Sequence, residues 1–286
     1  MALLITAKGP LILQSDFGTK ENAVAAMKGV AYSVDNNLRI FDLSHNITPF
    51  DIWEGAQVIA GVVPYWPAGT VFVSVIDPGV GTERKSIVLK TKTGHYFVTP
   101  DNGTLTLVAE EYGIEEVRVI DEEVNRLPGS ERSYTFHGRD VYAYTGARLA
   151  SGEISFMEVG PVLNIPIIMI EYERARLLDE NTVVGMIAKL DDPYGNIWTN
   201  IPIEVFDELG LNVEDSEMLH VEISQLGELI YEGEIPYAFS FGYVPEGDPL
   251  IYLNSSGTIA LAINWGNFSE TYGVYPGPEW SIKIQK

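Results

Sequence analysis

The sequence contains no cysteine. Without thiols the chain forms no disulfide framework, has no thiolate nucleophile and offers no cysteine ligand to zinc. Proteins that make no use of disulfides are typical of reducing compartments, so we expect a cytoplasmic location. The missing residue type therefore removes disulfide-rich domains, cysteine hydrolases and Cys-ligated zinc proteins from consideration.

Basic residues are scarce. Lys and Arg number 18 against 40 Asp and Glu, which gives a formal net charge of −22. A field of this sign repels nucleic acid and anionic membranes, so we expect neither as a partner. A cationic small molecule is not repelled, although the charge also has the simpler explanation that it keeps the protein in solution.

Long apolar runs are absent as well. No stretch of about 18 apolar residues occurs, which argues against a membrane-spanning helix. Residues 1–16 carry a short apolar run without a basic leading segment or a small-residue cleavage pattern. This pattern predicts a first strand and not a signal peptide.

Several catalytic signatures are missing too. The tract Gly79-Val80-Gly81 lacks the third glycine and the following helix of a dinucleotide fingerprint, and no Walker loop or Gly-x-Ser-x-Gly elbow is present. The chain lacks the closely spaced ligand pairs His-x-x-x-His and Asp-x-Asp, so we expect no bound metal ion. Metal-assisted hydrolysis with Asp16, His45, Asp77 and Asp101 as ligands stays open as an alternative.

The first part of the chain alternates strand-like with helix-like patterns. Apolar runs and period-3.6 spacing predict strands at 11–14, 38–43, 70–76, 86–89, 96–99 and 116–120, and helices at 22–34, 51–63 and 105–111. Such alternation is typical of an α/β domain in which helices flank a largely parallel sheet.

The last part of the chain is dominated by short strands. They are predicted at 182–191, 220–224, 229–235, 249–255, 258–264 and 281–285, with turn signals between them. This pattern indicates a smaller all-β, barrel-like domain. We place the boundary so that residues 1–175 form the α/β domain and residues 176–286 form the β-domain.

Polar residues follow strand after strand in the first domain. Asp16, His45, Asp77 and Asp101 each come shortly after a predicted strand. Parallel sheets gather ligands at the carboxyl ends of their strands, so we expect these residues at one edge. Strand ends also need turn formers, and Asp serves that purpose without any site.

Three residues of the first domain form a candidate catalytic set. A carboxylate, a guanidinium and an imidazole, here Asp77, Arg84 and His137, can together bind and orient one water molecule. Each also has a structural explanation, because Asp-Pro-Gly is a common turn, Arg84 can be a surface charge and His137 a hydrogen-bonded structural histidine.

The second domain contains two tracts rich in aromatic and amide side chains, at 191–200 and 252–257. Amides read purine edges and aromatic rings stack on them. A pair of hairpin turns explains the same composition, and both interpretations stay open on residue types alone.

Seven motifs, in this order, resemble those of the S-adenosylmethionine hydroxide adenosyltransferases, relatives of the fluorinase and chlorinase. They are Ser15-Asp16-Phe17-Gly18, Thr48-Pro49-Phe50, Asp77-Pro78-Gly79-Val80-Gly81 with Arg84, Pro100-Asp101-Asn102-Gly103, Thr135-Phe136-His137-Gly138-Arg139-Asp140, Asp192-Pro193-Tyr194-Gly195-Asn196 with Trp198-Thr199-Asn200, and Tyr252-Leu253-Asn254-Ser255. The resemblance covers nearly the whole chain.

The resemblance implies hydrolysis of S-adenosylmethionine to adenosine and methionine by in-line attack of water on the ribose C5′ atom. It implies a homotrimer whose active sites lie between one subunit's first domain and a neighbour's second, and no cofactor besides the substrate. It assigns Asp77, Arg84 and His137 to water activation. Gly138 matches a halide-side position that is serine in the fluorinase, and a long insertion typical of the fluorinase is absent here.

Substrate contacts follow from the same resemblance. They are Asp16 for the ribose hydroxyls, Phe50 as an aromatic wall beside the sugar, Tyr194 and Phe241 flanking adenine, Asn196 reading its edge, and Glu21 and Ser255 for the methionine ammonium and carboxylate. Ser256 stands where the fluorinase has an arginine. Halide transfer and a non-catalytic nucleoside or S-adenosylmethionine sensor remain as alternative functions.

Overall fold

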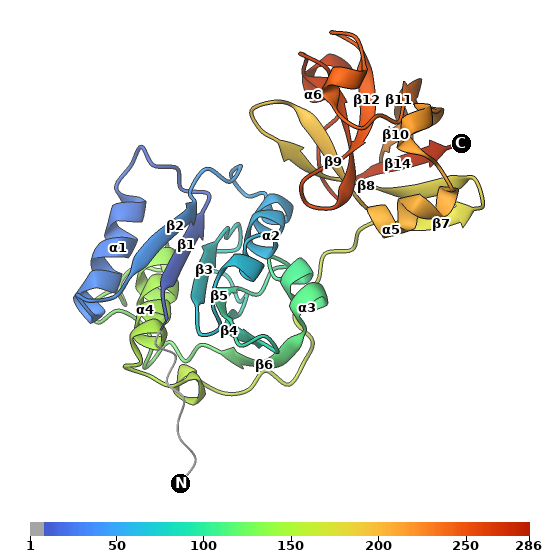
Figure 1. Cartoon of the computed structure of the whole chain (residues 1–286). Coiled ribbons are helices and arrows are strands. Elements are labelled where there is room, and N and C mark those ends of the chain that lie inside the picture. Colours follow the sequence, from blue (N-terminus) through green and yellow to red (C-terminus); the bar gives the residue numbers. More distant parts are fainter. Residues whose placement is uncertain (1–8) are drawn as a thin grey trace. The chain divides into compact units, whose positions relative to one another are not determined.

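The computed structural model describes residues 9–286, which form two compact units (Figure 1). The first unit ends at Ile170 and the second begins at Glu171, whereas the sequence placed the boundary after residue 175. The N-terminal run from which we predicted a first strand falls partly on residues 1–8, which lie outside the described residues. Each unit is described by itself below.

A six-stranded sheet forms the centre of the first unit. Its strands are β1 (Leu11–Ser15), β2 (Ile40–Ser44), β3 (Val71–Val75), β4 (Ser86–Thr91), β5 (Tyr96–Pro100) and β6 (Ile114–Val119). They lie in the order β2-β1-β3-β5-β4-β6. Strands β2, β1, β3 and β5 are mutually parallel.

Strand β4 is antiparallel to both of its neighbours, β5 and β6, so the sheet is mixed. The prediction of a largely parallel sheet is therefore correct for the four strands on one side and wrong for β4. The reason lies in the link from β4 to β5, a turn over residues 92–95 that contains Gly94 at φ +85°. A tight turn joins antiparallel strands, because a parallel connection needs a crossover of a dozen or more residues.

Helices cover both faces of this sheet (Figure 1). On one face, α1 (Ala23–Val34) and α4 (Tyr144–Ser151) pack against a core that includes Leu11 and Leu13 of β1. On the other, α2 (Ile52–Ala60) and α3 (Thr106–Tyr112) share a core with Ile12. Alternate residues of a strand point to opposite faces, which is why one short apolar strand serves two cores.

The segment from Gly138 to Ser151, for which the sequence pattern gave no element, is helical throughout. It consists of the π-helix η2 (Gly138–Ala143), followed directly by α4. A Cβ atom on Gly146 would lie 2.5 Å from Cγ2 of Val73, so α4 crosses β3 at a distance that only glycine permits. The short 3₁₀ turns η1 (Val63–Tyr65) and η3 (Phe156–Val159) complete the unit.

The second unit is built on an eight-stranded sheet with the path β11-β10-β14-β8-β9-β13-β12, and β7 pairs with β8 beside it. The strands are β7 (Arg176–Asp179), β8 (Thr182–Asp191), β9 (Asn196–Pro202), β10 (Met218–Gln225), β11 (Glu228–Pro236), β12 (Pro249–Leu253), β13 (Thr258–Ile263) and β14 (Trp280–Gln285). The short helices are α5 (Ile203–Phe206), η4 (Asp207–Leu209), η5 (Val213–Asp215), η6 (Phe241–Tyr243) and α6 (Phe268–Tyr272).

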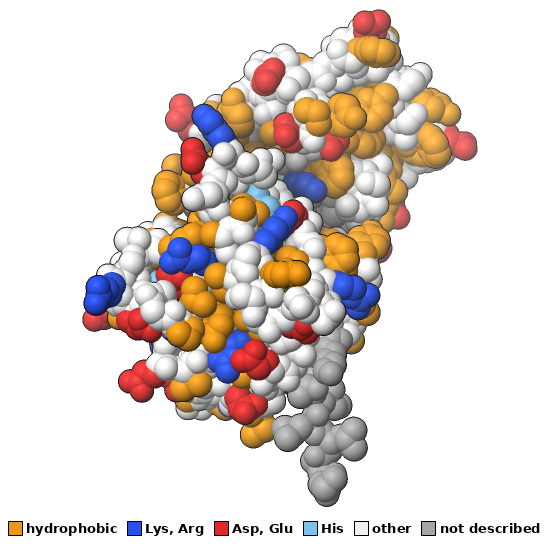
Figure 2. Space-filling model, turned by 90° about the vertical axis from the view of Figure 1, so that its left-hand side faces the viewer, with side chains coloured by type: hydrophobic (Ala, Val, Ile, Leu, Met, Phe, Trp, Pro, Cys, Tyr) orange, Lys and Arg blue, Asp and Glu red, His pale blue; other side chains and the backbone are white. Residues whose placement is uncertain are grey.

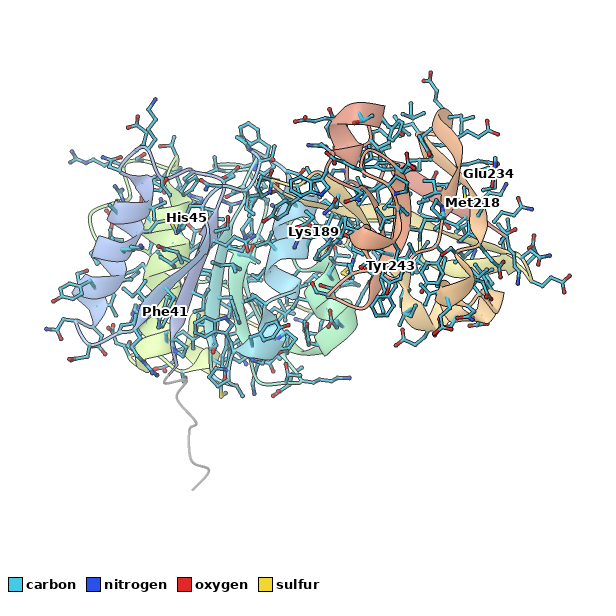
Figure 3. The ribbon with its side chains drawn as sticks, turned by 45° about the horizontal axis from the view of Figure 1, so that its top comes forward. Phe41, His45, Lys189, Met218, Glu234 and Tyr243 are labelled. Atoms are coloured by element: carbon cyan, nitrogen blue, oxygen red, sulfur yellow. The ribbon has the colours of Figure 1, made fainter. Side chains whose placement is uncertain are left out.

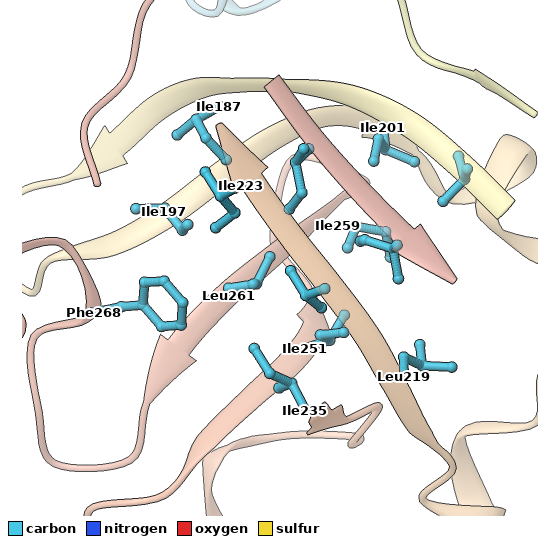
Figure 4. Packing of buried hydrophobic residues seen from close by; sticks show 14 of the residues in the cluster. Ile187, Ile197, Ile201, Leu219, Ile223, Ile235, Ile251, Ile259, Leu261 and Phe268 are labelled. Atoms are coloured by element: carbon cyan, nitrogen blue, oxygen red, sulfur yellow. The ribbon is translucent and has the colours of Figure 1, made fainter. Parts of the chain in front are cut away.

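This sheet curls around the larger of two apolar clusters in the unit, in agreement with the all-β prediction. Ile187, Ile197, Ile223 and Leu261 from four strands meet there beside Phe268 (Figure 4). Just after β11, Tyr237 forms a β-bridge to Ile251 of β12, which brings the two ends of the strand path together. The tract 191–200 holds one turn followed by β9, a strand that the sequence did not predict.

The surface and the helices agree with the bulk composition. On the face shown in Figure 2, basic side chains lie apart from one another, among acidic and hydrophobic ones. Between residues 9 and 286, no helix combines the length and the apolar character needed to cross a bilayer.

Candidate active site

The carboxyl ends of the four parallel strands bring the predicted polar residues to one edge of the sheet. Asp16, His45 and Asp101 follow β1, β2 and β5 directly, and Asp77 lies two residues after the end of β3. Figure 3 shows in which direction β2 runs, with His45 at its carboxyl end and Phe41 toward the other end. The convergence expected from parallel pairing is thus confirmed.

Asp77 and Arg84 form a bidentate ion pair at this edge. Arg84 Nη2 donates to Asp77 Oδ2 at 2.5 Å, and Nε donates to Oδ1 at 2.9 Å. The side chains are only 6% and 10% exposed, so the two charges are buried together. The loop between them turns at Gly79 and Gly81 (φ +78°), where the hydroxyl of Thr82 donates to the Gly79 carbonyl. Fork-to-fork pairing of this kind fixes both side chains in orientation.

His137 lies against the same guanidinium, 2.7 Å from Arg84 Nη2 to its Nδ1 atom. Arginine only donates hydrogen bonds, so Nδ1 must accept and the ring proton must lie on Nε2. Burial lowers the pKa of His137 from its ordinary value of 6.5, and the positive charge of Arg84 lowers it further. The imidazole is therefore neutral, and its buried Nε2 has no hydrogen-bond partner among the residues that the structure describes.

Ser86 and Tyr142 make further contacts that hold the guanidinium of Arg84 in place. Arg84 Nη1 donates to the Ser86 hydroxyl at 3.1 Å, and that hydroxyl donates to Tyr142 at 3.2 Å. The guanidinium carbon lies 5.5 Å from the centre of the Tyr142 ring, within cation–π range. Burial raises the pKa of Tyr142 far above its usual range, so the phenol stays protonated.

A cavity of about 270 Å³ opens beside this cluster. Asp77 and His137 line it together with Asp16 and Phe50. The backbone N–H of Phe50 donates to Asp16 Oδ2 at 2.9 Å, and Phe50 has φ +69°, a conformation that a bulky residue rarely adopts. Glu21 does not line this cavity and lies exposed in the loop before α1.

The second unit carries a larger cavity, of about 740 Å³. All four site residues predicted in this unit line it, namely Tyr194, Asn196, Phe241 and Ser255. Asn196 Nδ2 donates to Asp191 Oδ2 at 2.9 Å. A carboxylate only accepts hydrogen bonds, so this contact fixes the amide with its nitrogen toward Asp191 and leaves its oxygen as an acceptor.

Sequence reasoning missed two aromatic residues of this cavity, Phe239 and Trp265, which line it with exposed rings. Trp265 follows β13 and has φ +58°, which a tryptophan adopts only where its surroundings impose it. The available signal was the tryptophan in the turn Asn264-Trp265-Gly266, because exposed apolar residues that gather around one cavity are typical of binding sites.

A metal centre finds no support at either cavity. Within residues 9–286, no cluster of His, Asp and Glu is arranged to hold a metal ion. Both oxygens of Asp77 accept from Arg84, and the ring of His45 bonds Ser15 and Asp42. Asp16 and Asp101 accept from backbone N–H groups, so each member of the alternative ligand set has a hydrogen-bond partner within the protein.

Comparison with known proteins gives a consistent result. The family model described as the SAM hydroxide adenosyltransferase N-terminal domain matches residues 11–160, and that of the C-terminal domain matches residues 185–281. An "(R)-S-adenosyl-L-methionine hydrolase" of Methanocaldococcus jannaschii is 38% identical over 92% of this chain and 92% of its own length. A "Fluorinase" of Actinoplanes is 31% identical over 94% of this chain and 95% of its own length.

A solved structure shares the fold. The crystal structure of an uncharacterised conserved protein from Thermotoga maritima matches with a TM-score of 0.84 and 33% identity, over 96% of this chain and 100% of that one. Matches over both units, to family models and to relatives of similar length, lead to one conclusion: the chain belongs to the S-adenosylmethionine hydroxide adenosyltransferase family.

Proposed function

We propose that this protein hydrolyses S-adenosyl-L-methionine to adenosine and L-methionine by in-line attack of water on the ribose C5′ atom. The observation that carries the proposal is the buried Asp77–Arg84–His137 cluster beside a cavity that also holds Asp16. Relatives named "(R)-S-adenosyl-L-methionine hydrolase" share 31–38% of their residues with this chain. The reaction needs no cofactor, and the protein acts in the cytoplasm.

In this reaction the active site must activate and orient the nucleophile, and the leaving group needs no assistance. The water oxygen forms a bond to C5′, the C5′–S bond breaks, and its electron pair goes to the sulfonium sulfur, which leaves as the neutral thioether of methionine. No general acid is needed for such a leaving group. The water must lose one proton and must be aimed along the C5′–S axis, and positioning of that kind contributes strongly to rate.

The protonation pattern assigns different roles to the three residues. His137 presents Nε2–H, because Arg84 occupies its Nδ1, and it donates to the water oxygen. Asp77 is the carboxylate of the cluster, and each of its oxygens keeps a lone pair besides the one that faces Arg84. Asp77 takes the proton, and Arg84 stabilises the hydroxide character that develops.

Substrate recognition involves both cavities. In the first unit, Asp16 binds the ribose hydroxyls and Phe50 lies beside the sugar. In the larger cavity, Tyr194 and Phe241 stack on adenine. The free amide oxygen of Asn196 accepts a hydrogen bond from the exocyclic amino group of adenine. A purine with a carbonyl group at that position has no hydrogen to donate to this oxygen.

The methionine portion is bound less fully by the residues described. Ser255 lines the larger cavity and contacts the substrate carboxylate. Glu21 binds the ammonium group in this proposal, although it lines neither of the two cavities and the assignment rests on the family resemblance.

The active protein is a homotrimer in this proposal, with each site formed by the first unit of one subunit and the second unit of a neighbour. The larger cavity supports it, because its rim is unusually apolar for a free surface. Tyr194 and Trp265 are 68% and 87% exposed. Exposed aromatic residues around a cavity are typical of surfaces that a ligand or partner covers.

Substitutions in the water-binding cluster test the reaction. We expect Asp77→Asn and His137→Asn to lower kcat by about 10²- to 10⁴-fold, the usual contribution of acid–base catalysis. Adenosine and methionine are measured by chromatography, with both sulfonium epimers as substrate because the relatives' names specify the (R) form. The control Glu115→Gln removes one partner of an exposed ion pair in the same unit and should keep wild-type turnover.

Three results would contradict the proposal. Wild-type turnover in both variants would refute the assignment of the cluster. Formation of 5′-chloroadenosine on adding chloride would support halide transfer, the chemistry of the fluorinase relatives. Intact substrate after long incubation with the wild-type protein, despite tight binding, would indicate a sensor.

The acid limb of the pH profile tests the neutral state of His137. Burial and Arg84 lower the folded pKa of His137 below 6.5, while the nearby carboxylates Glu122 and Asp77 oppose the shift without reversing it. The stability that the neutral ring contributes is therefore complete above the unfolded pKa of about 6.5 and is lost as pH falls through the folded value. We predict that kcat is constant above about pH 6.5 and falls only below it. A limb centred above 6.5 would contradict a depressed pKa.

Subunit mixing tests the shared active site. Asp77→Ala damages the first unit, and Asn196→Ala damages the second. Mixed trimers, purified through two different affinity tags, should regain about a third of wild-type activity, because either mixed composition forms one intact site out of three in a ring of heterologous contacts. Mixed oligomers that stay inactive would show that both halves of a site come from the same chain.

A further inference from the structure

A hydrogen-bonded chain of side chains lies beneath the loop that carries Asp16. His45 Nδ1 lies 2.6 Å from the hydroxyl of Ser15, and His45 Nε2 lies 3.1 Å from Asp42 Oδ1. Lys28 Nζ reaches the other Asp42 oxygen at 2.6 Å. His45 is buried and does not line the cavity, so it has no direct route to a substrate.

The hydrogen bonds hold in either protonation state of the imidazole. The Asp42 carboxylate only accepts, so Nε2 of His45 carries a hydrogen and donates to it. Nδ1 bonds the Ser15 hydroxyl, as an acceptor when the ring is neutral and as a donor when it is charged. Ser15 Oγ in turn accepts from the backbone N–H of Phe17 at 3.4 Å. The imidazole is thus held at both nitrogens. Through the Ser15 hydroxyl, which also bonds the backbone of Phe17, it fixes the position of the loop.

His45 also holds the far end of the same loop through its backbone. Its carbonyl accepts from the N–H of Gly18 at 2.7 Å, where the chain turns at φ +68°. The tract Ser15–Gly18 is therefore held at its first residue by the imidazole and at its last by the carbonyl. Asp16 lies between these two attachments, with one carboxylate oxygen bound to the N–H of Phe50.

We propose that His45 is a positioning residue, which holds the Ser15–Gly18 loop so that the Asp16 carboxylate meets the ribose hydroxyls of the bound nucleoside. This inference rests on the proposed function, because it takes Asp16 as the ribose ligand. The Ser15–His45–Asp42 order resembles a nucleophile triad, but Ser15 is 0% exposed and lies behind the cavity wall. Its hydroxyl serves the backbone of the loop and does not attack a substrate.

Two substitutions at His45 separate its two hydrogen bonds. The amide of asparagine reaches about as far as Nδ1, so His45→Asn keeps a partner for Ser15 and loses Asp42. Glutamine reaches about as far as Nε2, so His45→Gln keeps Asp42 and loses Ser15. We expect His45→Gln to raise KM for S-adenosylmethionine and Kd for adenosine about tenfold, the usual effect of losing one hydrogen bond that orients a charged group. The asparagine variant should stay within about threefold of wild type.

The ribose hydroxyls supply a second comparison. Kd is measured by calorimetry for adenosine and for 2′,3′-dideoxyadenosine, which lacks the groups that Asp16 binds. The loss in His45→Gln should disappear with the dideoxy ligand, while kcat at saturating substrate changes little, because the ribose contact is made equally in the ground and transition states. His220→Gln, at a partly exposed histidine on β10, serves as the matched control and should bind both ligands like wild type.

Several outcomes would overturn the inference. These are equal losses in the two His45 variants, a loss that persists with the dideoxy ligand, or unchanged affinity in His45→Gln. Ser15→Ala removes the same link from the other side and should reproduce His45→Gln, so the test stands even if that variant fails to fold. Because the readout is nucleoside binding, a wild-type protein that binds adenosine without cleaving S-adenosylmethionine would refute the proposed function and leave this inference open to the same comparison.

Discussion

The buried pair of Asp77 and Arg84 is the interaction on which the rest of the site depends. Removing either charge would leave the other unpaired in a nearly solvent-free position, which costs several kcal/mol. Because the guanidinium holds both carboxylate oxygens and still faces Nδ1 of His137, it also decides which nitrogen of the imidazole carries the proton. One ion pair thus fixes the position of the Asp77 carboxylate and the tautomer of His137. It also fixes the place where a water molecule can contact a hydrogen-bond donor and an acceptor together.

The fold brings this pair together through the one strand whose direction the sequence pattern did not predict. Asp77 follows β3, whose carboxyl end lies at the ligand-binding edge. Arg84 precedes β4, and β4 runs antiparallel, so its first residue Ser86 pairs with Pro100 at the carboxyl end of β5. A parallel β4 would start at the opposite edge of the sheet and would carry Arg84 away from Asp77. The exception in the sheet is therefore what allows the site to form.

The sequence predicted the elements with strong local signals and missed those that depend on distant partners. Apolar runs and helical spacing gave the strands and helices near their observed bounds. The helical segment from Gly138 to Ser151 was not predicted, because glycine at 138 and 146 weakens helix propensity. Close packing of these glycines on Val75 and Val73 compensates for that weakness in the folded protein. For the site, motif order located the residues that now line the two cavities, whereas Phe239 and Trp265 lie in turns with no periodicity to reveal them. The orientation of Asn196 by Asp191 and the support of the Asp16 loop by His45 depend on side-chain geometry that no sequence pattern contains.

The central claim is that water, held by Asp77 and His137, attacks the ribose C5′ atom. Hydrolysis in ¹⁸O-labelled water, followed by mass spectrometry of both products, tests it most directly. We predict one labelled oxygen in the 5′-hydroxyl group of adenosine and none in methionine. Unlabelled adenosine, or label in methionine alone, would contradict attack at C5′ and with it the role given to the cluster.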